Sequence, residues 1–189
     1  MTADLLTPDQ FQFPSIALSG AVDYFMYGNF RNQLMNAPLQ GLVVVELSTL
    51  GGDPEVARMM GEDIRYHTEL NPDRRFVFLG KAAIYSAGTT FMAFFAKENR
   101  FLTRGTRLMI HERLISKTIS LDGPLTTCLA KVHAAINEIE SSIEIQNEGF
   151  ANLIIGSDVT MEEVLQHAPS NWYIEANEAM QRGLVQGVL

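Results

Sequence analysis

The pattern of apolar and polar residues predicts a strand, a helix and a second strand in the first half of the chain. Residues 41–47 are apolar almost without interruption, which is typical of a strand buried on both faces of a parallel sheet. Asp53 and Pro54 can cap and begin a helix, whose apolar positions then recur at Val56, Met59, Met60 and Ile64. Residues 75–80 form the next short apolar run. This order predicts a βαβ unit, so we expect an α/β fold around a mostly parallel sheet.

Further elements are expected on both sides of this unit. In the N-terminal part, residues 1–14 have mixed polarity and two prolines, and we expect them to form a flexible arm before one compact domain at 15–189. The remaining predictions are a strand at 16–20, a helix at 22–35, a helix beginning near Ser86, a short helix at 160–166, an extended segment at 171–174 and a last helix at 176–182.

The longest periodic segment predicts one long helix at about 124–155. Its apolar residues recur at alternating steps of four and three, at Leu125, Leu129, Val132, Ile136, Ile139 and Ile143. Such a narrow seam favours packing against another helix. We expect that partner to belong to another subunit, because the helix is long relative to the domain, although packing on the domain's own core stays open.

Charge and composition limit the classes of partner. The formal net charge of −8, with no dense stripe of Lys and Arg, argues against nucleic acid. The first residues lack the features of a signal peptide, and no apolar run reaches the roughly 18 residues of a membrane span, so we expect a cytoplasmic protein away from membranes. Cys128 is the single cysteine and excludes a disulfide framework within the chain.

Two residues could form a nucleophile and its base. Ser86 stands in the segment 83–88 just before a predicted helix, and His111 ends the strand-like segment 106–111. A serine hydroxyl needs a base within hydrogen-bond reach to attack a carbonyl. Ile84 breaks the hydrolase pattern Gly-x-Ser-x-Gly. Taken singly, Ser86 would be a helix cap and His111 a structural histidine.

Taken together, these segments resemble the ClpP family, the proteolytic subunit of the Clp protease. The family places its nucleophile in Ala-x-Ser-x-Gly and its base at the end of Met-Ile-His, matched here by Ser86 and by residues 109–111. Residues 176–185 also match the family's Ala-x-Glu-Ala and Gly-Leu-Val motifs. The resemblance implies an α/β ClpP/crotonase-like fold of stacked βαβ units with a projecting long helix.

The resemblance also implies an oxyanion hole and a third triad residue. Gly51-Gly52 matches the family's Pro-Gly-Gly, with Leu50 in place of proline, so Gly52 N–H and Ala87 N–H would bind the oxyanion. The family's aspartate falls on Asn171. Asparagine can orient the imidazole through its carbonyl but supplies no negative charge. Asp158 or Ser170 could substitute, although the spacing favours neither.

The resemblance implies a serine endopeptidase that cleaves peptides or unfolded polypeptides in a homo-oligomer of stacked rings, through an acyl-enzyme. No metal-ligand set and no phosphate-binding loop appears in the sequence, so we expect no cofactor and no metal, and an unfolding ATPase of the AAA+ class would be a separate partner. Two alternatives stay open. One is a catalytically weak or inactive ClpP-like subunit with a structural or regulatory role, and the other is a crotonase-like acyl-CoA enzyme.

Overall fold

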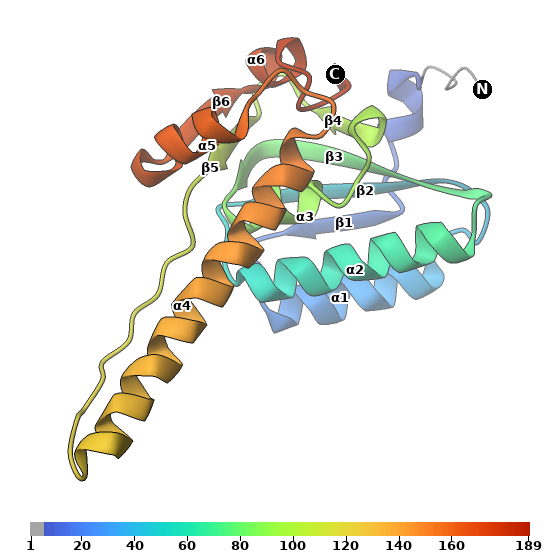
Figure 1. The fold of residues 1–189 in the computed structure, drawn as a ribbon. Helices are drawn as coiled ribbons and strands as arrows, with labels where there is room; N and C mark the ends of the chain where they lie inside the picture. Colours follow the sequence, from blue (N-terminus) through green and yellow to red (C-terminus); the bar gives the residue numbers. More distant parts are fainter. Residues whose placement is uncertain (1–5) are drawn as a thin grey trace.

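The computed structural model describes residues 6–189 and shows an α/β fold around a largely parallel sheet (Figure 1). The main sheet runs in the order β1-β2-β3-β4-β7, and every neighbouring pair along it is parallel. The strands are β1 (Ile16–Ser19), β2 (Gly41–Thr49), β3 (Arg74–Tyr85), β4 (Arg100–Leu102) and β7 (Gly187–Val188). The predicted parallel α/β architecture is therefore confirmed.

Two further strands extend this sheet beside the far end of β3. They are β5 (Arg107–Ile110), which is parallel to β3, and β6 (Trp172–Glu175), which is antiparallel to β5. β3 can serve both β4 and β5 because it is longer than the predicted strand at 75–80 and continues to Tyr85. Its register against β2 shifts between Leu47 and Thr49, and Ala82 has a φ of 59°. This irregularity lets one strand reach two neighbours.

Two helices cover one face of the sheet, as Figure 1 shows. They are α1 (Tyr24–Asn36) and α2 (Pro54–Leu70). The Asp53 carboxylate caps α2 by accepting a hydrogen bond from Glu55 N–H at 2.8 Å, as the sequence predicted. The apolar face of α2, including Met60 and Ile64, is buried in the main core with β2 and β3. This capping and packing fix the loop that precedes α2.

The remaining short elements follow the chain. They are α3 (Ala87–Met92), α5 (Met161–His167), α6 (Ala176–Gln181) and the 3₁₀ turns η1 (Pro8–Phe11), η2 (Lys97–Asn99) and η3 (Ala168–Ser170). Part of the expected N-terminal arm is packed, because Phe11 is buried with its ring centroid 4.9 Å from that of Phe101. Residues 1–5 of that arm lie outside the described residues.

The long helix α4 (Leu125–Ile154) projects from the body, and residues 112–122 run alongside it in an extended conformation (Figure 1). The apolar seam is left open, since Leu129, Ile136, Ile139 and Ile143 are 58%, 43%, 43% and 49% exposed. The domain's own core therefore does not cover the seam. None of the helices between residues 6 and 189 is long and apolar enough to span a membrane.

Candidate active site

Ser86 stands at a strained turn between β3 and α3. Its φ of 53° and ψ of −115° are unusual for a residue with a side chain, and such strain concentrates at functional sites. Four hydrogen bonds hold the turn: Ser86 N–H donates to Met109 O at 2.8 Å, while Thr89 N–H, the Thr89 hydroxyl and Thr90 N–H donate to Ser86 O at 2.9, 2.6 and 3.2 Å. Ser86 occupies the N-cap position, but its side chain makes no capping hydrogen bond. The hydroxyl is thus free to point elsewhere.

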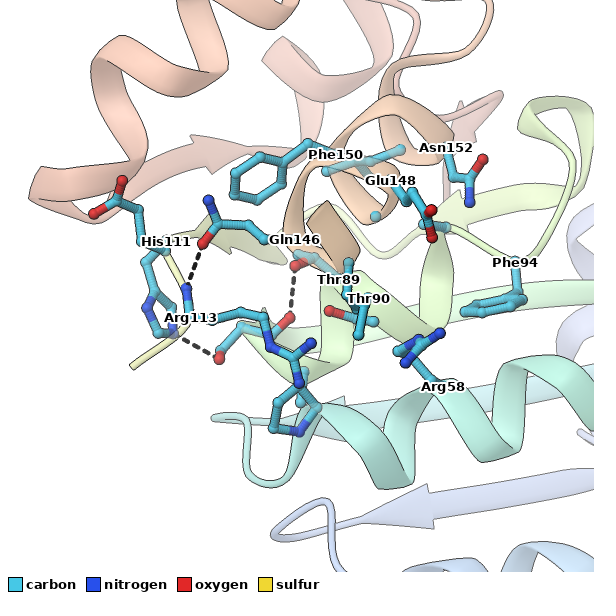
Figure 2. Close-up of a pocket in the computed structure, with 18 of the residues that line it drawn as sticks. Arg58, Thr89, Thr90, Phe94, His111, Arg113, Gln146, Glu148, Phe150 and Asn152 are labelled. Carbon is cyan, nitrogen blue, oxygen red and sulfur yellow. Dashed lines mark hydrogen bonds between the residues drawn. The ribbon is translucent and has the colours of Figure 1, made fainter. Parts of the chain in front are cut away.

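His111 meets this hydroxyl. Tyr85 and Met109 are paired in the parallel ladder of β3 and β5, so the residues that follow these strands lie at the same edge of the sheet. His111 Nε2 lies 2.6 Å from Ser86 Oγ, within hydrogen-bond distance (Figure 2). Both residues are half-buried. When Nε2 accepts the serine proton, Nδ1 carries the ring's own proton, which is the arrangement that a general base needs.

The two backbone N–H groups expected to form the oxyanion hole border the same pocket as Ser86 and His111. Gly52 bridges to Val22, but the hydrogen bonds of that bridge use Gly51 O and Asp53 N–H. Ala87 is the first residue of α3, where N–H groups have no partner inside the helix. Within residues 6–189, neither the Gly52 nor the Ala87 N–H makes a backbone hydrogen bond. Both donors are available.

The glycines of this loop are required by close contacts. A Cβ on Gly51 would lie 2.9 Å from Ser86 Cβ, and a Cβ on Gly52 would lie 2.3 Å from Val22 O. Gly52 also has a φ of 152°, which side chains rarely permit. Leu50, at the position of the family's proline, is exposed. The loop can therefore approach Ser86 at Gly51 and Val22 at Gly52 only because these positions lack side chains.

Asn171 lies where the ladder of β5 and β6 would continue. Ile110 pairs with Trp172, so the next residues in this register are His111 and Asn171. Asn171 has a φ of 58° and is exposed. In the described part of the chain, its side chain makes no hydrogen bond with His111, whose one hydrogen bond is to Ser86. The structure thus brings Ser86 and His111 together, while Asn171 follows the last paired residue of β6 and is not joined to the ring.

The other candidates for the third position are placed elsewhere. Asp158 accepts a hydrogen bond from Arg182 Nε at 2.8 Å, and Ser170 ends the turn η3. Hydrogen bonding to Arg182 also lowers the pKa of the Glu163 carboxyl. This ion-pair cluster ties α5 to α6 and makes no contact with His111.

A pocket of about 390 Å³ opens next to Ser86 and His111. Its walls come from α2, α3, α4 and the segment after His111, and Figure 2 shows their side chains turned inward. Five charged residues that the sequence did not single out contribute to it: Arg58, Glu62, Glu112, Arg113 and Glu148. They lie on a predicted helix, an extended segment and the long helix. From the sequence, single charged residues in such segments are expected to face the solvent. No motif could have identified them.

Between residues 6 and 189, no three His, Cys, Asp or Glu side chains gather into a set that could bind a metal ion. The arrangement of a hydroxyl, an imidazole and free backbone donors around one pocket is suited to acyl transfer.

Comparison with known proteins shows which known fold this chain resembles. No protein-family model matches the chain. Among solved structures, it is similar to an Asn-to-Asp mutant of ClpP1 from Listeria monocytogenes, with a TM-score of 0.69 and 18% sequence identity, over 92% of this chain and 90% of that chain. Together with the parallel sheet and the projecting helix, this similarity shows that the chain has a ClpP-like fold.

Proposed function

We propose that the protein is a serine endopeptidase of the Clp type that cleaves peptides or unfolded polypeptides. The observation that carries this proposal is the distance of 2.6 Å between Ser86 Oγ and His111 Nε2 at a strained turn that opens into a pocket. The ClpP-like fold supports it, because that similarity spans nearly the whole chain.

The reaction would proceed through an acyl-enzyme. Ser86 Oγ attacks the carbonyl carbon of the substrate while its proton passes to His111 Nε2. The C–N bond then breaks, the leaving amine takes that proton, and the acyl group stays on Ser86. His111 next accepts a proton from water, whose oxygen attacks the ester. The acid leaves, and the proton returns to Ser86 Oγ.

Backbone donors would stabilise the charge that develops in this reaction. The N–H groups of Gly52 and Ala87 bind the oxyanion of the tetrahedral intermediate. Ala87 adds the partial positive charge at the start of α3, which acts over short range. Asn171 would orient His111 after a change of side-chain rotamer, with its Oδ1 accepting a hydrogen bond from His111 Nδ1–H, because no such bond exists in the present conformation.

We place this activity in a cytoplasmic homo-oligomer of stacked rings. The exposed seam of α4 supports assembly, because a projecting helix with that much apolar surface favours association in water. Substrate would enter an enclosed chamber, and a separate AAA+ ATPase would unfold larger proteins before they enter.

A fluorophosphonate probe tests the proposal, because it labels a serine only when that serine is activated as a nucleophile. We expect the wild-type protein to be labelled at Ser86, with labelling lost in Ser86→Ala and strongly slowed in His111→Ala. Ser141→Ala is the matched control, since Ser141 is exposed on α4 away from the pocket. Absence of labelling in the folded wild-type protein would refute the proposal.

One observation favours a second candidate, a catalytically weak or inactive ClpP-like subunit. The Asn171 side chain supplies no charge and is not bonded to His111. The same probe distinguishes the two, because a weak enzyme is labelled yet hydrolyses peptides slowly, whereas an inactive subunit is not labelled.

A further inference from the structure

The pocket beside Ser86 extends between two helices that carry opposite charges. Arg58 points into it from α2 and Glu148 points into it from α4, on the other side (Figure 2). No ion pair joins the two side chains, so the space between them is open to a ligand. Phe94 and Phe150 also line the pocket and supply apolar surface. The pocket therefore combines apolar walls and neutral polar side chains, such as Gln146 and Asn152, with a guanidinium and a carboxylate on facing sides.

The positive charge of Arg58 is only partly neutralised by its neighbours. Arg58 Nη1 lies 2.8 Å from the Glu55 carboxylate, and Arg113 forms an ion pair with the other oxygen of the same carboxylate. One carboxylate thus serves two guanidinium groups. In residues 6–189, Nε and Nη2 of Arg58 donate no hydrogen bond. Arg58 keeps N–H groups available to a ligand.

The carboxylate on the other side of the pocket, that of Glu148, has no partner among the described residues. Across the described residues, the Glu148 carboxylate, which is exposed, takes part in no hydrogen bond and no ion pair, while Glu62, another acid that lines the pocket, is paired with Arg65 at 2.6 Å. A ligand that satisfies both sides must accept a hydrogen bond from Arg58 and donate one to Glu148. A carboxamide does both with adjacent atoms.

We propose that Arg58 and Glu148 determine the specificity of this pocket and select a glutamine side chain on the N-terminal side of the cleaved bond. This inference rests on the proposed function, because it assumes that Ser86 attacks the carbonyl of the residue whose side chain fills the pocket. Arg58 stands one helical turn, about 6 Å, beyond Pro54 at the start of α2. We expect glutamine to reach Arg58 better than asparagine does, because its carboxamide lies one methylene farther from the backbone.

Other side chains satisfy only part of the site. A glutamate side chain pairs with Arg58 but meets the like charge of Glu148, and a lysine side chain does the reverse. A leucine side chain fills the apolar part and leaves both charged groups without a partner. Because a site built to hydrogen-bond its ligand disfavours an analogue that lacks those groups, we expect glutamine to be preferred to all three by about tenfold.

Peptidyl aryl phosphonates measure this preference without requiring turnover. These probes form a bond from phosphorus to Ser86 Oγ and release a phenol, and their side chain enters the pocket. The series carries Gln, Asn, Leu, Glu or Lys at that position and is used on the full-length protein, beside a small fluorophosphonate that has no side chain. We expect the second-order rate of labelling to be highest for Gln, by about tenfold over Leu, Glu and Lys.

Charge reversal provides the decisive variant. Glu148→Lys places two donors across the pocket, so we expect the preference to move from the Gln probe to the Glu probe. Glu144→Lys makes the same charge change one turn earlier on α4, outside the pocket, and should keep the wild-type order. Labelling by the small probe with equal or faster reaction of the Leu probe would overturn the inference alone, as would an order that Glu148→Lys does not change. Failure of every probe, including the small one, would overturn the proposed function and this inference with it.

Discussion

At the scale of single residues, the proposed mechanism depends on a hydroxyl and an imidazole that act in one step. The Ser86 hydroxyl is hydrogen-bonded to His111 and to no capping partner, so its removal takes away chemistry and little packing. We expect Ser86→Ala and His111→Ala each to lower peptide hydrolysis by about three orders of magnitude or more. The double variant should be no slower than the worse single variant, because both residues serve the same step. Kinetics with a fluorogenic peptide, beside circular dichroism to verify folding, measure this; losses that multiply would contradict it.

Asn171 tests whether the third position limits the rate. Asn171→Asp adds a carboxylate next to His111 in the register of β5 and β6, where it would stabilise the imidazolium formed during attack. We expect turnover to rise at least about tenfold with little change in KM, since the gain belongs to the transition state. Steady-state kinetics of the two proteins decide it. An unchanged kcat in a folded Asn171→Asp variant would show that Asn171 does not serve His111.

The residues of the site differ in how far the sequence reveals them. Ser86 and His111 could be predicted because each stands in a short motif, at the end of a strand, with the right separation. Arg58 and Glu148 could not, because their placement on facing sides of one pocket depends on where α4 leaves the body relative to α2. The left-handed conformations of Ser86 and Asn171 were equally hidden, since both are imposed by neighbouring strands and turns.

At the scale of elements, the sequence predicts the middle of a strand better than the residues at which the strand ends. Continuous apolar runs identified β2 and the start of β3, but β3 continues to Tyr85 through polar and small residues that follow the apolar run. That extension depends on pairing with β5, a contact distant along the chain. It also delivers Ser86 to the end of the strand. The boundary that matters most to the site is thus set by tertiary contacts.

One buried arginine connects the elements that form the pocket. Arg100 is 2% exposed, and its guanidinium donates to carbonyls after α3, at Ala93 and Phe95, and at the end of α4, at Asn152 and Leu153. It also reaches the carbonyl of Leu184 at 3.3 Å. Burial lowers the pKa of Arg100 to about 10, which leaves it charged at neutral pH. Arg100 therefore fixes the exit of α4 relative to α3.

Because Arg100 makes these hydrogen bonds, we expect even a conservative substitution of it to lower the stability of the protein strongly. Arg100→Lys keeps the charge but cannot donate to all these carbonyls, so buried acceptors lose their partners, and we expect unfolding to become about 3 kcal/mol easier. Chemical denaturation followed by fluorescence measures the change. Arg104→Lys is the matched control, because Arg104 is exposed. Equal denaturation midpoints for the two variants would show that the Arg100 hydrogen bonds contribute little.

At the scale of the whole molecule, the projecting helix is the feature whose apolar surface the chain itself leaves uncovered. The seam positions Ile136, Ile139 and Ile143 are exposed, and the extended segment beside α4 contacts the helix through polar groups, such as Lys117 with Glu138. Apolar side chains along one line of a helix are best explained by a partner, since single exposed residues would be scattered. The seam could be predicted from periodicity alone, because it follows from local spacing.

Assembly through this seam can be tested by placing charge on it. Ile136→Glu with Ile139→Glu puts two carboxylates into the contact, and we expect the wild-type oligomer to separate into smaller species, because burying an unpaired charge is costly. Asn137→Glu with Ser141→Glu adds the same charge at exposed polar positions of the same helix and should leave the mass unchanged. Light scattering coupled to gel filtration reports the mass of each protein.

The variants distinguish a specific apolar contact from simple repulsion, because both pairs raise the negative charge of α4 equally. A wild-type monomer at micromolar concentration, or an unchanged mass after the isoleucine substitutions, would show that α4 does not hold subunits together.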